Sequence, residues 1–376
     1  MSRLLKLRPL FLAAAVLGLA ASAPGLVRRD EAALHGYLIG YLFWAGLSIG
    51  SLGLLMVNHT AGGRWGILIR RPLEAAAAAL PLCAVLFLPI LFGANSLYAW
   101  AHSPNDEHIR KISAYLNVPF LAIRAAFYFL IWSGLTMGLR KNSLRQDGGA
   151  DVSRAFQRIS APGLLVFFLT TTFAFTDWMM SLEPHWYSTI YGASVLVGHA
   201  VGALAGAIVV AVLLREESDL RPLVNPARLH QLGNLLFAFV MFWIYLSFCQ
   251  YFLIWSANLS EEVTWIIRRT TGGWQWLAIG LVISHFALPF FALLLRDVKK
   301  RAVLLGIVAA WLVVAHWFDT LWLVAPALRP DGFQIRWFEI ASTVGVGGLW
   351  LWYVAGRLAS RRLVPVGDPR LAEALS

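Results

Sequence analysis

Long apolar runs, separated by short polar turns, occupy almost the whole chain from position 6 to position 357. A bilayer core about 30 Å thick needs roughly 20 mainly apolar residues for one helical crossing. Ten runs reach that length, so the pattern predicts an all-α integral membrane protein with about ten transmembrane helices. The predicted helices cover 6–24, 32–57, 73–100, 115–139, 158–181, 187–214, 231–255, 273–295, 301–324 and 335–357.

The runs also predict how the chain is organised. No stretch long enough for a separate soluble domain lies between them, so we expect one multi-pass membrane domain over 1–376. Within it we expect a first four-helix bundle at 32–181 and a second at 187–324, with 1–24 and 335–357 as flanking helices. The composition, 59% hydrophobic and 14% charged, excludes an ordinary soluble domain.

The first apolar run has features of a secretory signal peptide. It has a basic start, a short apolar stretch and, at Ala21-Ser22-Ala23, small residues typical of a cleavage site. Pro24 follows that site directly and disfavours cleavage there, so we expect a retained first helix.

The net charge of +11 suggests nucleic-acid binding, but the basic residues follow a membrane pattern. The two ends of the chain and every second loop carry 22 Lys and Arg, whereas the intervening loops carry 8. Cytoplasmic loops are enriched in Lys and Arg, so this asymmetry predicts that both termini are cytoplasmic. We therefore expect membrane lipid, and no nucleic acid, around the chain.

The sequence offers little to hold a redox cofactor or a metal. Cys83 and Cys249 both lie in apolar runs and are too few and too far apart for an iron–sulfur cluster or a disulfide. His185 and His199 have a spacing that would place two haem ligands on one helix face, but no second helix carries a matching pair. We therefore expect no catalytic, cofactor-binding or metal-ligating residue in this chain.

Glycine and tryptophan patterns predict packing rather than chemistry. Gly198, Gly202 and Gly206 recur every four residues, and Gly46 and Gly50 repeat that spacing once. Small residues at this spacing let helices approach closely in lipid. Tryptophans near predicted helix ends are expected to anchor the chain at the membrane interface. They are Trp100, Trp178, Trp186, Trp255, Trp265, Trp274 and Trp322.

Ionisable side chains within the predicted helices are the candidate functional residues, because each costs roughly 2.5 to 3.5 kcal/mol at the bilayer centre. His199 and His285 fall near mid-depth. His316 and Asp319 are three apart and therefore share one helix face, in the predicted outer half of the membrane. The full set is Arg124, Asp177, His199, His285, His316, Asp319 and Glu339.

Arg124 and Asp177 lie at comparable depths on neighbouring helices, so we expect them to pair. A structural ion pair and a role in conduction or ligand binding both fit these positions. Thr170 lies two turns from Asp177 on the same face and would extend a hydrogen-bonded chain, although such hydroxyls often bond their own helix backbone. Glu74 opens the third helix, where the helix dipole also favours a carboxylate.

Four segments carry a resemblance to a known family. They are TDWMMSLEPHWYSTIYG, QLGNLLFAFVMFWIYLSFCQYFLIWSANLSEEVTWIIRR, GGWQWLAIGLVISHFALPFFALLLRD and HWFDTLWLVAP. Over about 30–357 the chain resembles membrane subunits of alternative complex III, the bacterial quinol:electron-acceptor oxidoreductase, within the wider NrfD/PsrC-like family.

The resemblance implies a subunit of the bacterial cytoplasmic membrane. Its implied partners are an NrfD-like sister membrane subunit, an iron–sulfur subunit, and multihaem and monohaem cytochromes c, often beside a terminal oxidase. Quinol is then the substrate of the complex, and haem c and iron–sulfur clusters belong to the partner subunits. This subunit is expected to bind no metal and to take part in proton translocation.

A candidate proton path combines the resemblance with the polar residues described above. The resemblance matches Asp177, Arg124, His199 and Glu74 to the family's buried polar path, and Asp319 and His285 less closely. The complete candidate path is Asp177, Arg124, His199, Glu74, Thr170, His285, His316 and Asp319. Glu183 and His185, in the turn after the fifth helix, are expected at its outer mouth.

Two other functions fit the same sequence. A quinol-binding NrfD-type anchor would use the outer His and Asp residues as proton acceptors for the quinol hydroxyls. A secondary transporter would be expected to show broken helices and repeated halves around a midplane site, and we find no convincing inverted repeat.

Overall fold

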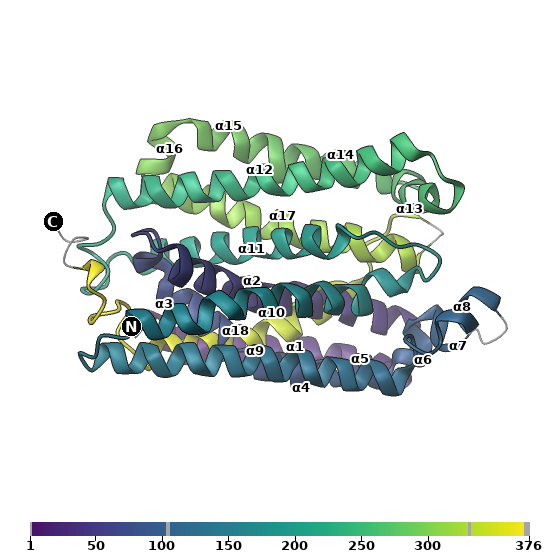
Figure 1. Ribbon diagram of the computed structural model, residues 1–376, viewed down its shortest axis with the longest axis horizontal. Helices are drawn as coiled ribbons and strands as arrows, with labels where there is room; N and C mark the ends of the chain where they lie inside the picture. The colour runs from purple at the N-terminus through teal and green to yellow at the C-terminus, as the bar shows by residue number, and fades with distance from the viewer. Residues whose placement is uncertain (1, 103–105, 330–331, 372–376) are drawn as a thin grey trace.

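The computed structural model describes residues 2–102, 106–329 and 332–371, and all regular elements in these ranges are helical (Figure 1). Ten helical stretches are long and apolar enough to cross a membrane, which confirms the predicted all-α, multi-pass architecture. They are Leu5–Val27, Glu31–Ala61, Gly66–Phe92, Val118–Asp147, Ser153–Leu182, Tyr191–Leu213, Pro226–Ala257, Trp274–Leu294, Ala302–Leu328 and Trp337–Ala359.

The two ends of the helix bundle differ in what they carry (Figure 1). Both chain termini lie at one end, here termed the termini end. The other end, termed the opposite end, carries short helices that connect the spans. These are α6 (Ala94–Leu97), α7 (Ala99–His102), α8 (Glu107–Ile112) and α13 (Ser260–Thr270).

Two helices form the centre of the fold. α2 (Glu31–Ala61) is buried along most of its length and packs against α3 (Gly66–Ala77), α10 (Ser153–Trp178), α11 (Tyr191–Leu213) and α18 (Trp337–Ala359). α11 also contacts α10, α12 (Pro226–Ala257) and α17 (Ala302–Leu328). The outer helices are α1 (Ser2–Val27), α9 (Val118–Asp147), α12 (Pro226–Ala257), α17 (Ala302–Leu328) and α18 (Trp337–Ala359).

The flanking helices α1 and α18 pack closely against each other. A Cβ atom on Gly18 would overlap the backbone of Gly345, and one on Gly348 would overlap the backbone of Ala15. Small residues thus let these two helices approach at backbone distance, as expected for contacts within lipid.

Two of the spans are built from shorter helices. The third continues from α3 through α4 (Leu80–Leu86) and α5 (Leu88–Phe92), and a proline stands near the start of each short helix. Proline lacks the amide N–H of a regular helix, so the backbone is interrupted there. The eighth span consists of α14 (Trp274–Leu281), the π-helix η2 (Val282–Ala287) and α15 (Leu288–Leu294).

Several boundaries differ from the predicted ones, and two of the differences place charged residues in helices. The third span begins at Gly66 rather than at 73, so Arg70 and Arg71 lie inside a helix and are buried. The helix accommodates them because the carboxylates of Glu74, Asp147 and Asp368 lie beside the two guanidinium groups. The amphipathic helix α13, with Glu261 and Glu262 in its first turn, was not predicted.

The packing predictions hold only in part. Gly46, Gly50, Gly198 and Gly202 make close contacts with neighbouring helices, but a Cβ on Gly206 would meet nothing within 4 Å, so its assignment as a packing residue was wrong. Most of the tryptophans expected as interface anchors are buried in the chain itself instead. These are Trp100, Trp178, Trp186, Trp265 and Trp274.

The positive-inside pattern predicts the orientation of this bundle. With the termini end cytoplasmic, a cysteine at the exposed Thr189 will react with a membrane-impermeant maleimide added outside intact cells, in a Cys83→Ala, Cys249→Ala background. A cysteine at the exposed Ser360, at the termini end, is the matched control and will react only after the membrane is opened. The reverse pattern would overturn the orientation.

Candidate functional site

Two buried histidines contact each other where α11 meets α17. The Nδ1 atom of His199 lies 2.9 Å from Nε2 of His316, so one of these nitrogens donates a hydrogen bond to the other. On the next turn of α17, an oxygen of Asp319 lies 3.6 Å from the other nitrogen of His316. All three residues are at most 3% exposed. The contact brings together three residues that the sequence placed on two different helices.

His285 completes this group, here termed the histidine cluster. The π-helix η2 carries it, and its ring centroid lies 4.1 Å from that of Trp243 and 6.2 Å from that of His316. Among the described residues, neither ring nitrogen of His285 has a hydrogen-bond partner. The Nε2 atom of His199 also has none among them. These unpartnered nitrogens are buried groups that can still accept or donate a proton. His285 also lies in a π-helical turn, a rare feature that often occurs at functional sites.

Glycines make room for the histidine cluster. A Cβ atom on Gly46 of α2 would overlap the ring of His199, and one on Gly202 of α11 would overlap the ring of His316. The glycines that the sequence assigned to helix packing thus also position the imidazoles.

The cluster also has the ligand types of a metal site. Donor atoms of His285, His316 and Asp319 lie within 4.8 Å of one another. Two histidines and one carboxylate can hold a divalent cation with positions left open for water or substrate. The sequence predicted no metal ligand, and spacing along one helix did not indicate this grouping because His285 comes from a different helix.

A large lateral cavity lies beside the histidine cluster. Its volume is about 640 Å³, and residues from α11, α12, α13, α14 and α17 line it. Exposed side chains on α12, including Tyr245 and Phe248, border the cavity, so it reaches the outer surface of the bundle. Asp319 is part of its wall and accepts a hydrogen bond of 3.3 Å from Trp243. The other polar residues that line the cavity include Ser194, Gln250 and Arg269.

Glu183, expected at the outer mouth of the path, is buried in ion pairs. It lies 2.8 Å from Arg269 and 3.0 Å from Arg268, both on α13. Burial lowers the pKa of Arg269, and the Glu183 carboxylate opposes that shift. Because Arg269 also lines the lateral cavity, Glu183 contacts the wall of the cavity rather than an open mouth.

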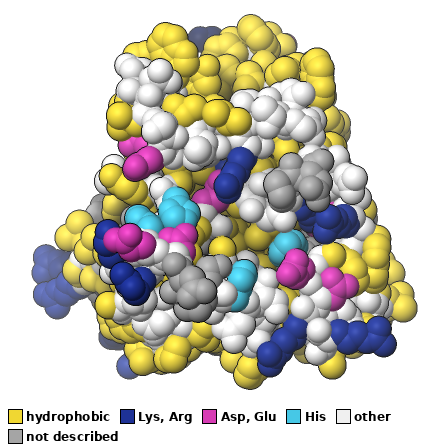
Figure 2. All heavy atoms as spheres, turned by 90° about the vertical axis from the view of Figure 1, so that its right-hand side faces the viewer, with side chains coloured by type: hydrophobic (Ala, Val, Ile, Leu, Met, Phe, Trp, Pro, Cys, Tyr) yellow, Lys and Arg dark blue, Asp and Glu magenta, His cyan; other side chains and the backbone are white. Residues whose placement is uncertain are grey.

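His185 has a different environment from Glu183. It is exposed at the opposite end, and its Nε2 atom lies 2.9 Å from Asp106. The ring of His108 packs beside it, with centroids 4.9 Å apart. Figure 2 shows that histidine and acidic side chains gather on this face of the molecule. His185 thus belongs to a surface group, separate from the buried histidine cluster.

Arg124 and Asp177 form the expected ion pair. The guanidinium of Arg124 donates two hydrogen bonds, of 2.8 and 3.0 Å, to the two oxygens of Asp177. The hydroxyl of Tyr128 donates a third, of 2.9 Å. Arg124 also donates to the carbonyl of Tyr115, and burial together with the Asp177 charge raises the pKa of the Tyr115 hydroxyl to about 12. The carboxylate is completely buried and well satisfied.

Thr170 does not bond to Asp177. Its hydroxyl donates to the backbone carbonyl of Val166 on its own helix and accepts a hydrogen bond from the indole of Trp132. Asp177, the histidine cluster and Glu74 are thus not joined by hydrogen bonds among the described residues. Phe175 lies on the helix that carries Asp177, and its ring packs against that of His199, with centroids 5.2 Å apart.

Glu74 lies at the termini end, within a group of arginines. It lies 2.9 Å from Arg70 and 2.6 Å from Arg71. Arg71 also contacts both oxygens of Asp147 on α9, and Arg70 contacts Asp368 near the C-terminus. Glu74 is therefore a member of an ion-pair network and not a lone carboxylate in a first helical turn.

Glu339, the remaining ionisable residue of the predicted set, is completely buried at the start of α18. It forms an ion pair with Arg329 and accepts a hydrogen bond from the backbone N–H of Arg336. Burial lowers the pKa of Arg329 to about 10. These contacts cap the helix, so we assign Glu339 no chemistry.

Comparisons with known proteins add no assignment. No protein-family model matches the chain, and no curated protein matches it.

Proposed function

We propose that this chain is an ActF-type membrane subunit of alternative complex III, a respiratory quinol-oxidising complex. In this proposal the chain has no redox centre of its own, contributes a buried proton-translocation path and forms a scaffold for the redox subunits. Its support comes from the four sequence segments that resemble this family and from the ten spans. The proposed location is the bacterial cytoplasmic membrane, with both termini cytoplasmic.

The histidine cluster is the observation that carries the proton path. A neutral imidazole has one donor and one acceptor nitrogen, so a proton can enter at one nitrogen while another leaves from the second. The hydrogen bond between His199 and His316 joins two such groups in the buried part of the fold. Asp319 can exchange a proton with His316 after a small side-chain movement, and it also faces the lateral cavity.

The structure suggests a route for protons that differs from the one expected from the sequence. It begins at Glu183 and Arg269 at the opposite end, crosses the lateral cavity to Asp319, and reaches His316 and His199. The cavity is large enough to hold water between these groups. In this route the pair of Arg124 and Asp177 supports the fold and does not carry protons.

The lateral cavity favours a second candidate function, direct binding of quinol. Its volume of about 640 Å³ falls within the range of roughly 300 to 1,000 Å³ that is usual for small-molecule sites. It combines apolar walls with the carboxylate of Asp319, which would accept a proton from a quinol hydroxyl. A quinone analogue that photolabels α12 or α17 in the purified complex would favour this alternative.

The proposed assembly is tested by affinity purification from mildly solubilised membranes. We expect the tagged chain to bring down the proposed NrfD-like sister subunit, iron–sulfur subunit and cytochromes c, with haem absorbance in the complex. After dissociation, the isolated chain is expected to show no haem band, because its two cysteines lie on different helices and its contacting histidines, His199 and His316, are hydrogen-bonded to each other at 2.9 Å, too close to bind a haem iron from opposite sides. Recovery of the chain without cytochromes, or with a haem of its own, would contradict the proposal.

A further inference from the structure

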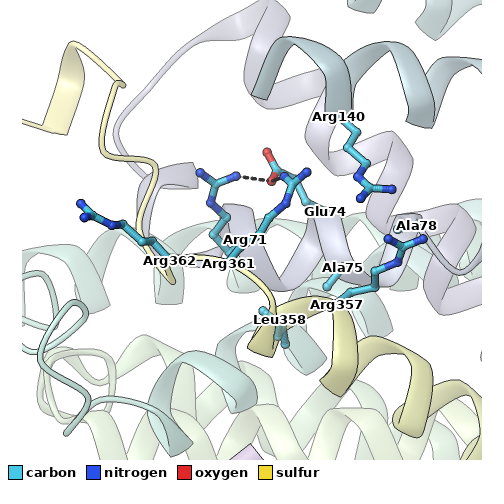
Figure 3. Close-up of a pocket in the computed structure, with 9 residues that line it drawn as sticks. All are labelled: Arg71, Glu74, Ala75, Ala78, Arg140, Arg357, Leu358, Arg361 and Arg362. Atoms are coloured by element: carbon cyan, nitrogen blue, oxygen red, sulfur yellow. Dashed lines mark hydrogen bonds and ion pairs between the residues drawn. The ribbon is translucent and has the colours of Figure 1, made fainter. Parts of the chain in front are cut away.

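A crevice at the termini end, here termed the arginine crevice, lies between three helices (Figure 3). α3 contributes Arg71 and Glu74, α9 contributes Arg140, and the end of α18 with the segment after it contributes the remaining cationic side chains. Figure 3 shows Arg71, Arg140, Arg357 and Arg361, from these separate elements, around one space, with the side chain of Arg362 directed away from them. The arginines that line it are Arg71, Arg140, Arg357, Arg361 and Arg362.

Positive charge in the crevice exceeds negative charge. Glu74 is the one acidic side chain in the lining, and it already lies 2.6 Å from Arg71 and 3.8 Å from Arg361. Among the described residues, no carboxylate forms an ion pair with Arg140, Arg357 or Arg362. Three of the five arginines therefore lack a charged partner within the chain.

Buried N–H groups in the crevice also lack partners. The Nη2 atom of Arg361 and the Nε atom of Arg71 are buried and have no hydrogen-bond acceptor among the described residues. A buried donor without a partner is costly, and more so when it is charged. Burial lowers the pKa of Arg361, the Glu74 carboxylate opposes that shift, and the guanidiniums of Arg71 and Arg140 add to it. An anion in the crevice would balance its excess positive charge.

The remaining walls indicate what kind of anion fits. Ala75, Ala78 and Leu358 give the crevice an apolar side next to its arginines. α18 ends at Ala359, so the crevice lies at the level where a span leaves the membrane. Basic pockets between transmembrane helices at this level suit the phosphate groups of lipids, whose acyl chains continue along the apolar side. Arginine is well matched to phosphate oxygens because its planar group donates two parallel hydrogen bonds.

We propose that the arginine crevice binds the phosphate group of an anionic phospholipid. Arg140 and Arg357 bind the phosphate from two sides, and the charges of Arg361 and Arg71 attract it. The site is separate from the proposed proton path and does not depend on it.

Native mass spectrometry of the purified, delipidated full-length chain tests this proposal. Dioleoylphosphatidylglycerol is expected to bind more tightly than the zwitterionic dioleoylphosphatidylcholine. A basic residue that contacts the anionic group of a lipid contributes roughly a fivefold gain in binding, so the double variant Arg140→Gln, Arg357→Gln, which removes two such contacts, is expected to bind phosphatidylglycerol roughly 25-fold more weakly. Neither residue belongs to the ion pairs that hold Glu74, which favours normal folding of this variant.

The matched control removes the same charge elsewhere at the termini end. Arg296 and Arg301 are exposed near α16 (Arg296–Lys300), and the variant Arg296→Gln, Arg301→Gln is expected to bind phosphatidylglycerol as the unmodified chain does. If the crevice variant fails to fold, the exposed Arg362→Gln is expected to show a roughly fivefold loss. Equal losses in the crevice and control variants would overturn the proposal. It would also be overturned if phosphatidylcholine bound equally well, or if inorganic phosphate alone filled the site without any preference for lipid.

Discussion

Asp177→Asn is expected to prevent the chain from folding stably. The substitution leaves the guanidinium of Arg124 buried opposite an amide that cannot balance its charge, and it disturbs the hydrogen bond from Tyr128. Removing one partner of a buried pair typically costs about 3 to 5 kcal/mol of the free energy of unfolding. A loss of this size is a large part of the stability of an ordinary domain. We expect little monodisperse protein after purification, measured by size-exclusion chromatography of samples heated in steps.

Two further variants show whether charge imbalance causes the loss. Replacing both partners, with Arg124→Met and Asp177→Leu, leaves no unpaired charge and is expected to restore part of the thermal stability. Glu107→Gln breaks an exposed ion pair with Lys111 and is expected to leave the thermal stability unchanged. If Asp177→Asn instead assembles with unchanged thermal stability and loses proton translocation, the pair is functional and our structural interpretation is wrong.

The fold was largely predictable because lipid imposes strong constraints on sequence. A segment that crosses the bilayer must be long, apolar and helical, so ten runs could be read without any knowledge of their packing. The errors lie where polar groups are satisfied by distant residues. Arg70 and Arg71 looked like loop residues, yet they are buried in α3 because Asp368 and Asp147 lie beside them. Arg70 and Asp368 are 298 positions apart, and no local pattern reports such a contact.

The candidate site was predictable by residue type but not by grouping. The cost of ionisable groups in lipid identified the four members of the histidine cluster, and helical spacing placed His316 and Asp319 on one face. Spacing within one helix cannot show that His199 and His285 meet that face from two other helices. Arg269 could not be predicted as part of the site, because α13 lies outside the long apolar runs. Its pairing with Glu183 depends on the turn after α10 packing against α13.

The histidine cluster is expected to control proton translocation without being needed for quinol oxidation. In the proposed complex, His199→Gln, His316→Gln and Asp319→Asn each remove one titratable group while keeping a polar side chain of similar size. Interrupting a relay at any link blocks the same flow, so all three variants are expected to show the same loss of protons released per electron in reconstituted vesicles. Quinol oxidation is expected to continue, because the redox centres of the proposed complex lie in other subunits.

The design separates conduction from packing. His102 is exposed and bonded to the carbonyl of Asn95 at the opposite end, so His102→Gln makes the same chemical change outside the cluster and should leave the ratio of protons to electrons unchanged. Because the rings of His199 and His316 fill space left by Gly46 and Gly202, a structural role predicts poor assembly in the cluster variants, which size-exclusion chromatography would reveal. Only a conduction role predicts assembled complexes that oxidise quinol with weakened proton release. Normal proton release in all three assembled variants would end the proton-path hypothesis, and the imidazoles would then serve the packing of α2, α11 and α17.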